Sequence, residues 1–151
     1  MKRHLLLAAF SVFAVSLAAS AAGIPAGGFA GTWTANFDRS YFAGTPPKVD
    51  MCIIAADGTV TVNETSSTGK SSTWHYTPID GQPVQVIGRD NVTVTVHNVN
   101  SHINEHSWNM NGKTATSKSI LSDDGKTTVF IMDGTDKDGK PFHEMVVYDK
   151  E

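Results

Sequence analysis

The stretch Val92-Thr93-Val94-Thr95-Val96-His97 alternates an apolar, β-branched side chain with a polar one at every step. A period of two places the valines on one face of an extended strand and the polar side chains on the other. This alternation predicts a strand with one face in a core and one face toward solvent. Similar runs, rich in Val, Ile, Thr and aromatic residues, predict strands near 31–38, 48–55, 59–65, 71–77, 83–87, 91–98, 102–110, 113–121, 126–132 and 141–149.

Asn-Gly and Asp-Gly pairs separate most of these runs, and such pairs favour tight hairpin turns because both residues tolerate positive φ. No segment carries a helical stripe, and a short helix is expected only at Arg39 to Ala43. The sequence therefore predicts an all-β protein, an antiparallel up-and-down meander. Closure into a barrel of about 8–10 strands would cover its edges most completely. A two-sheet sandwich is the alternative, although it usually needs long crossovers, and no long connection is obvious here.

The first 21 residues have the three-part layout of a secretory signal peptide. Lys2, Arg3 and His4 form a basic start, an apolar run follows from Leu5 to Ala19, and Ala19-Ser20-Ala21 offers a cleavage site. The apolar run is shorter than the about 20 residues that span a membrane comfortably, which disfavours the alternative of an uncleaved anchor. We expect a signal peptide at 1–21, a flexible lead-in at 22–30 and a single barrel domain at 31–151. The mature protein is then periplasmic or secreted, in a bacterial context, with no membrane span.

The expected mature chain is mildly acidic. Lys2 and Arg3 lie in the signal peptide, so ten basic side chains remain against 15 acidic ones, a net charge of −5 with histidine neutral. Nucleic acids and anionic membranes attract basic patches, so both are disfavoured as partners. Cys52, the single cysteine, lies in the apolar run Met51-Cys52-Ile53-Ile54 and is expected to be a buried small hydrophobe. The sequence leaves the oligomeric state open.

Four segments carry a resemblance to known families. Gly31-Thr32-Trp33 resembles the G-x-W opening of lipocalins and their calycin relatives, in which the tryptophan packs across one end of the barrel and a short helix often follows. The last strand, Glu144 to Glu151, is similar to the closing strand of fatty-acid-binding proteins. The mature chain also resembles a group of exported bacterial proteins described as lipocalin-like, through two further segments: Tyr76-Thr-Pro-Ile-Asp-Gly-Gln-Pro83 and Asp138-Gly-Lys-Pro141.

The lipocalin pattern also includes an arginine on a late strand, packed over the tryptophan. Residues 126–151 contain no arginine, and only Arg39 and Arg89 follow the signal peptide. The resemblance therefore implies the barrel and the structural role of Trp33 without supplying the cation that accompanies it.

Large apolar side chains on several predicted strands are the first candidate site. Trp74 shares a face with Tyr76, and Phe130 shares a face with Met132. A small barrel lined in this way can hold one small ligand, or the same side chains can fill a solid interior. We expect an exported barrel that binds a small apolar or amphipathic ligand, with no cofactor. The expected lining residues are Trp74, Tyr76, Trp108, Phe130, Met132 and Tyr148.

Histidines form a second candidate, because His97, His102 and His106 lie within ten residues. Neutral imidazoles bind zinc or copper, and a three-histidine site with an open position would be of a catalytic type. The spacing matches no established metal motif, so the alternative is a set of polar positions on a solvent-facing edge.

Other chemistry has weaker support. Glu105 and Glu144 lie in predicted strands, and an inward carboxylate could act as a general acid or base. No G-x-S-x-G motif is present for a hydrolase. These residues favour a binding protein over an enzyme.

Two questions stay open at this level. A structural or interaction protein of the cell envelope, with a filled core and no ligand, is a third hypothesis, and it predicts no deep pocket. On the last strand, Phe142, Val146 and Tyr148 share one face and His143, Met145 and Val147 the other, and both sets are suitable for burial. A slip of one residue in register would exchange them.

Overall fold

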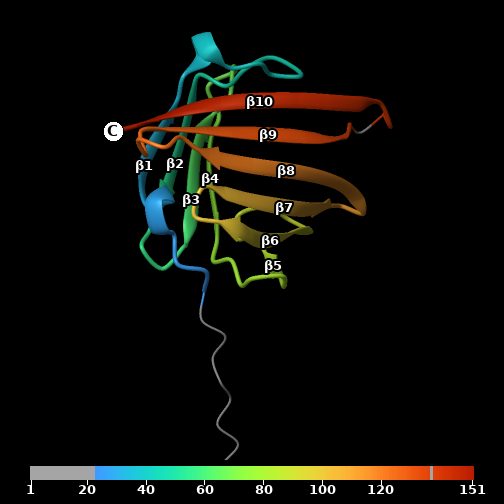
Figure 1. The fold of residues 1–151 in the computed structure, drawn as a ribbon. Coiled ribbons are helices and arrows are strands. Elements are labelled where there is room, and N and C mark those ends of the chain that lie inside the picture. The colour runs from blue at the N-terminus through green and yellow to red at the C-terminus, as the bar shows by residue number, and fades with distance from the viewer. Residues whose placement is uncertain (1–22, 137) are drawn as a thin grey trace, which may run out of the picture.

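The computed structural model describes residues 23–136 and 138–151, and they form one antiparallel sheet of ten strands that curls into a barrel (Figure 1). The strand order is β4-β3-β2-β1-β10-β9-β8-β7-β6-β5. Strands that are consecutive in sequence therefore pair, except β4 and β5, which form the two ends of the sheet, and the first strand also pairs with the last. The strands are β1 (Gly31–Ala35), β2 (Val49–Ile54), β3 (Val60–Thr65), β4 (Ser71–Tyr76), β5 (Pro83–Gln85), β6 (Val92–Asn100), β7 (Ile103–Met110), β8 (Lys113–Leu121), β9 (Thr127–Thr135) and β10 (Pro141–Lys150).

The sheet closes at a short seam between β4 and the chain that follows β5. His75 and Ile87 exchange two backbone hydrogen bonds of 3.0 and 2.9 Å there. Gly88 makes this approach feasible, because a Cβ atom at this position would lie 2.5 Å from the Thr73 carbonyl oxygen. The barrel is therefore nearly closed, and the predicted antiparallel meander and barrel are confirmed.

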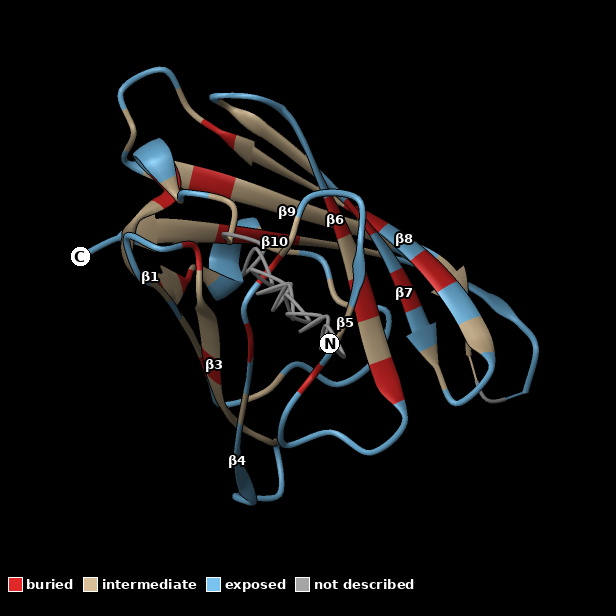
Figure 2. Ribbon diagram, turned by 90° about the horizontal axis from the view of Figure 1, so that it is seen from below, coloured by how far each residue is buried: buried red, intermediate tan, exposed pale blue. Residues whose placement is uncertain are grey.

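Side-chain alternation follows the predicted faces. Val92, Val94 and Val96 on β6 are buried, whereas Thr93 and Thr95 between them are less so. Bands of buried positions separated by less buried ones continue on β7 and β8 (Figure 2). One face of the sheet thus forms the interior, as the alternating sequence requires.

The first strand is shorter than predicted and ends at Ala35. The Asn36 side chain accepts a hydrogen bond of 3.2 Å from the Arg39 amide, which caps a short 3-10 helix, η2 (Phe37–Arg39). The prediction of a helix from Arg39 to Ala43 was therefore wrong in its position, because an asparagine at the N-cap starts the turn earlier. Phe37 lies in this helix rather than on the strand.

Residues 23–30, for which the sequence predicts a flexible lead-in, pack against one end of the barrel. The Ile24 amide donates to the Pro78 carbonyl at 3.0 Å and the Ala26 amide to the Ala56 carbonyl at 3.2 Å. Phe29, in the short 3-10 helix η1 (Gly27–Phe29), is buried and belongs to a core cluster. The expected signal peptide at 1–21 lies outside the described residues.

Trp33 closes this end of the barrel. Its side chain is fully buried against Phe29 and Leu121, and its indole Nε1 donates to the Phe29 carbonyl at 2.8 Å. Register pairs Trp33 with Lys150 on β10, and the Lys150 ammonium lies 5.0 Å from the centre of the indole ring. A late-strand cation therefore does pack over the tryptophan, but it is a lysine where the lipocalin pattern has an arginine.

The last strand presents its even-numbered residues to the interior, where Glu144, Val146 and Tyr148 line the cavity described below. Val147, on the opposite face, is also buried. The segment around η2 crosses it, with the Asn36 amide bonded to the Val147 carbonyl at 2.7 Å. Both faces of β10 are covered, which explains why its sequence pattern was ambiguous. In the described part of the chain, no helix has the length and apolar character needed to cross a membrane.

Candidate ligand cavity

The barrel encloses a cavity of about 510 Å³, within the range of about 300–1,000 Å³ that is typical of small-molecule sites. Its walls come from β1–β4, from β6–β10 and from the segment that includes Ile24 and Phe29. The interior is therefore not solid. This excludes the filled core that a purely structural role would imply, and leaves space for a small molecule.

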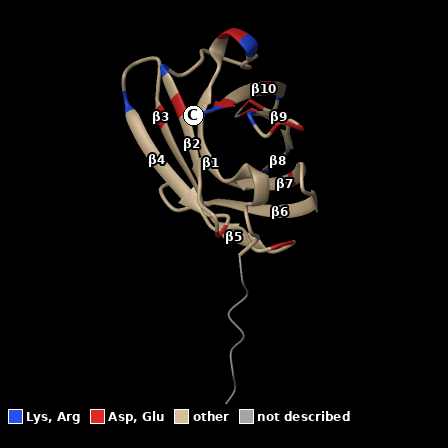
Figure 3. Ribbon diagram, turned by 60° about the vertical axis from the view of Figure 1, so that its left-hand side comes forward, with Lys and Arg blue, Asp and Glu red and all other residues tan. Residues whose placement is uncertain are grey.

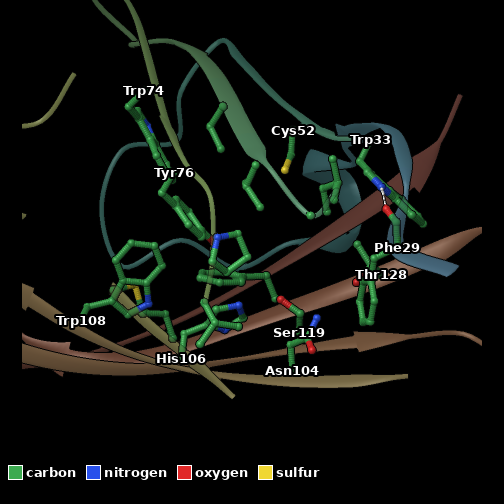
Figure 4. A pocket seen from close by; sticks show the side chains of 18 of the residues that line it. Phe29, Trp33, Cys52, Trp74, Tyr76, Asn104, His106, Trp108, Ser119 and Thr128 are labelled. Carbon is green, nitrogen blue, oxygen red and sulfur yellow. Dashed lines mark hydrogen bonds between the residues drawn. The ribbon is translucent and has the colours of Figure 1, made fainter. Parts of the chain in front are cut away.

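All six side chains predicted to line the interior do line this cavity. Trp74 and Tyr76 come from β4 and Trp108 from β7, whereas Phe130 and Met132 come from β9 and Tyr148 from β10. Figure 4 shows Trp74, Tyr76 and Trp108 gathered on one side of the cavity and Phe29 with Trp33 on the other. Their contact with a ligand remains a prediction.

The aromatic side of the cavity has a defined geometry. Trp74 and Tyr76 lie nearly parallel, with ring centres 6.3 Å apart and an interplanar angle of 11°. Trp108 meets both at right angles, with ring centres 6.3 Å from Trp74 and 5.9 Å from Tyr76. These are favourable edge-to-face distances, so the three rings hold one another as a fixed apolar wall. We refer to Trp74, Tyr76 and Trp108 as the aromatic corner.

The two indoles of the aromatic corner differ in their hydrogen bonding. Trp108 donates through Nε1 to the Ser117 hydroxyl at 2.8 Å. Trp74 Nε1 is buried and has no hydrogen-bond partner within the described residues. A buried donor without a partner is rare, because its desolvation is not compensated. Trp74 therefore offers an unused donor in the wall of the cavity.

His106 is the second unsatisfied group in the cavity wall. It is 8% exposed, and its Nδ1 atom has no partner in the part of the chain that the structure describes. Burial lowers the pKa of His106 to about 4, although a hydrogen bond with the Ser117 backbone acts in the opposite direction. The imidazole is consequently neutral at physiological pH.

The three histidines considered as metal ligands do not come together. His106 faces the cavity and pairs with Val96 in the β6–β7 ladder. His97 is the residue after Val96, so it points to the outer face, where its side chain is 60% exposed. His102 lies in the turn before β7 and contacts the Ser101 hydroxyl. Across residues 23–136 and 138–151, no group of three or more His, Cys, Asp or Glu side chains could hold a metal ion. His97 and His106 are thus kept apart because they lie on opposite faces of the β6–β7 hairpin.

Asp50 is a buried carboxylate that sequence analysis did not single out. It is 7% exposed, and its Oδ2 accepts a hydrogen bond of 2.7 Å from the Tyr148 hydroxyl. Its Oδ1 has no partner among the described residues. Burial raises the pKa of Asp50 to about 6; the Tyr148 hydrogen bond opposes this, and the negative charges of Glu64 and Glu144 add to it. The carboxylate is thus mostly ionised at neutral pH but readily affected by its surroundings.

Glu64 and Arg89 form an ion pair at the cavity wall. Their side chains approach to 2.7 Å, and the Arg89 guanidinium also lies 4.8 Å from the centre of the Trp74 ring. Sequence analysis missed both residues as well as Asp50. For Asp50 and Glu64 a signal existed: Asp50 has the same parity as the inward Cys52 and Ile54, and Glu64 the same parity as Val60 and Val62. Arg89 lies outside the strands, so no periodicity could place it.

The positions of the two strand glutamates and of the cysteine show which of them reach the cavity. Glu144 faces the cavity, whereas Glu105 points outward and pairs with Lys118 at 2.9 Å. Cys52 lines the cavity wall, and burial raises the pKa of its thiol to about 12. A thiol with such a pKa remains protonated and unreactive, as expected, although the side chain is half-buried rather than buried.

Comparison with solved structures places this barrel among known ones. The fluorescent protein UnaG superposes with a TM-score of 0.54 at 18% identity, covering 82% of this chain and 97% of that one. A Schistosoma mansoni fatty acid binding protein in complex with arachidonic acid gives a TM-score of 0.55 at 15% identity, covering 82% and 96%. This chain has a calycin fold. At these identities the likeness concerns the fold alone.

The calycin fold agrees with the resemblance carried by the Gly31-Thr32-Trp33 opening. Trp33 packs across one end of the barrel and a short helix follows the first strand, as that resemblance implies. No protein-family model matches the sequence, and no curated protein matches it. The assignment of the calycin fold therefore rests on the architecture of the barrel and on the packing of Trp33.

Proposed function

We propose that this calycin binds a small apolar or amphipathic molecule inside its barrel, as a protein exported to the periplasm or beyond the cell. The observation that carries the proposal is the cavity of about 510 Å³ lined largely by aromatic and aliphatic side chains. Burial of apolar surface would provide most of the binding free energy, at about 25 cal/mol for each Å² removed from water.

Two further observations support an occupied interior. Trp74 Nε1 and His106 Nδ1 are buried in the cavity wall and lack partners within the described chain, so a ligand with polar atoms could satisfy them. The aromatic corner provides a preformed rigid wall, which lowers the entropy lost on binding. One solved structure with this fold, the Schistosoma mansoni protein, was determined with arachidonic acid.

Export is the part of this proposal that rests on sequence. The basic start, apolar run and small-residue site of residues 1–21 support it. Fractionation of cells that express the full chain tests it, with N-terminal sequencing of the product. We expect a periplasmic or secreted chain that starts at Ala22. A full-length chain retained in the cytoplasm contradicts export and leaves ligand binding unaffected.

A cavity-filling substitution tests binding. Ser119 on β8 lines the cavity, whereas Thr116 on the same strand is exposed on the outer face. Ser119→Phe adds a ring to the interior, and Thr116→Phe adds the same ring outside. We expect Nile red, an uncharged apolar dye, to bind the wild-type protein and Thr116→Phe alike, and Ser119→Phe at least about tenfold more weakly. Circular dichroism checks that both variants fold.

Failure of Nile red and of uncharged lipids to bind the folded wild-type protein would contradict the proposal. Equal dye affinity for the wild-type protein and a folded Ser119→Phe variant would show that the dye binds elsewhere, and would also contradict it.

A further inference from the structure

The residues that line the cavity include more acidic than basic side chains. Among the described residues that line the cavity, Glu64 and Glu144 are acidic and Arg89 is basic. Asp50 is not among these lining residues, but it accepts a hydrogen bond from Tyr148, which is one of them. Register pairs Asp50 on β2 with Glu64 on β3. Figure 3 shows acidic segments, in red, on these two neighbouring strands. We call Asp50, Glu64 and Glu144 the acidic belt.

Arg89 is already engaged and cannot readily receive a ligand anion. Its guanidinium pairs with Glu64 at 2.7 Å and stacks over Trp74 at 4.8 Å. A ligand carboxylate would have to displace Glu64 from this pair and leave that glutamate without its partner. His106 does not supply a second cation, because burial holds its pKa near 4.

Two carboxylates of the acidic belt have oxygen atoms that can accept a further hydrogen bond from a ligand. Asp50 is more than nine-tenths buried on the inward face of β2, and its Oδ1 lacks a partner among the described residues. The Glu144 side chain lines the cavity, and its Oε1 accepts a weak hydrogen bond of 3.3 Å from the Ala43 amide. Negative charge therefore remains after the internal pairing of Glu64 with Arg89. Such a region attracts a cation and repels an anion, most strongly where water is excluded.

On the basis of the proposed interior binding, we propose that the ligand is an amphiphile with a positively charged head, an amine or ammonium group. The head lies against Glu144, the negative charge of Asp50 adds to its attraction, and the apolar part lies along the aromatic corner. Free fatty acids are disfavoured, even though a fatty acid binding protein shares the fold. Trp74, Tyr76 and Trp108 add attraction for a cation through their ring faces.

Three probes with one tail and different heads test this inference: dodecylamine, 1-dodecanol and dodecanoate. Displacement of Nile red from the mature wild-type protein at pH 7.5 gives their affinities below micelle-forming concentrations. We expect dodecylamine to bind more than about tenfold tighter than dodecanoate, with dodecanol between them, because the belt attracts one head and repels the other. Dodecanoate binding as tightly as dodecylamine overturns this inference and leaves the proposed function intact. Binding of none of the three overturns both.

Two belt variants and one matched control locate the selectivity. Glu144→Gln and Asp50→Asn each remove one negative charge while preserving shape, and Asp123→Asn removes one from an exposed turn. We expect each belt variant to reduce the preference for dodecylamine over dodecanoate by at least about threefold, with dodecanol unchanged. Asp123→Asn leaves the preference as in the wild-type protein. A preference that survives in both belt variants, or falls equally in Asp123→Asn, overturns the assignment to the belt.

Discussion

Two tryptophans on opposite sides of the interior show how differently this barrel uses the same side chain. Trp33 is fully buried, its indole N–H donates to the Phe29 carbonyl, and Lys150 covers its ring. Trp74 borders the cavity with part of its surface accessible, and its N–H has no partner within the described residues. One indole has every interaction it needs, and the other does not.

This difference separates a structural end of the barrel from the end where we propose that the ligand binds. Around Trp33, Phe29 and Leu121 complete a small core that seals the barrel. Around Trp74, polar groups are buried without full satisfaction, and burial without a partner destabilises a fold by about 1–3 kcal/mol for each group. Such groups are retained where they have a use. The comparison therefore assigns stability to the first end and supports the proposal that the ligand is recognised at the second.

The largest expected effect is the loss of the Trp33 side chain. Trp33→Ala removes a fully buried indole and leaves a cavity in the small core that Trp33 forms with Phe29 and Leu121, which we expect to lower the free energy of unfolding by about 3–5 kcal/mol. Trp74→Ala removes a partly exposed indole, so we expect its decrease in the free energy of unfolding to be at most about half as large, while the affinity for Nile red falls. Urea unfolding measures both. Equal losses in the two variants would contradict the division into two ends.

The next effect concerns Asp50 and the dependence of stability on pH. Its pKa is about 6 in the folded protein and near 3.8 when unfolded, so the unfolded state ionises first as pH rises. The contribution of Asp50 to stability is therefore fully present below pH 3.8 and is lost as pH rises through 6. We expect Asp50→Asn to stabilise the protein at pH 7.5 by up to about 3 kcal/mol, and not at pH 3.5. Asp123→Asn serves as the control, and thermal unfolding at both pH values is the measurement.

His106 acts in the opposite direction over nearly the same pH range. Its pKa is about 4 when folded and 6.5 when unfolded, so the unfolded state takes up a proton first as pH falls. Stability from the neutral imidazole is present above pH 6.5 and is lost as pH falls through 4, by up to about 3 kcal/mol. We expect His106→Phe to remove this acid-side loss, and the exposed His75→Gln to leave it unchanged. An unchanged acid-side slope in His106→Phe would contradict the buried neutral imidazole.

The smallest expected effect concerns the lysine over Trp33. Lys150→Met removes the cation from the indole face but keeps the aliphatic stem, so we expect a loss of about 0.5–1 kcal/mol. Lys150→Arg retains the cation and is expected to match or exceed the wild-type stability. Urea midpoints distinguish the three proteins, and a Lys150→Met midpoint equal to that of the wild type would show that the cation contributes nothing.

Local sequence signals were sufficient for most of the fold and for the apolar part of the site. The alternation in Val92 to Val96 and the Asx-Gly pairs depend only on neighbouring residues, so strands and turns were predictable. The aromatic corner followed from the shared parity of Trp74 and Tyr76.

Features that depend on register or on a loop were not predictable. The contact of Lys150 with Trp33 exists because β1 pairs with β10 in one register. The inward face of β10 was ambiguous because the η2 segment buries Val147 from outside. His106 and His97 were grouped by sequence distance, yet the strand period puts them on opposite faces. Arg89 reaches Glu64 from a loop, and no local pattern indicates that contact.

Native mass spectrometry of the mature chain, purified without detergent from the cells that make it, tests the central claim of an occupied interior most directly. We expect a population with one small molecule bound per chain, and addition of dodecylamine to give a one-to-one complex that the Ser119→Phe variant does not form. A spectrum of the bare chain alone, with no adduct after dodecylamine, dodecanol or dodecanoate is added, would contradict it.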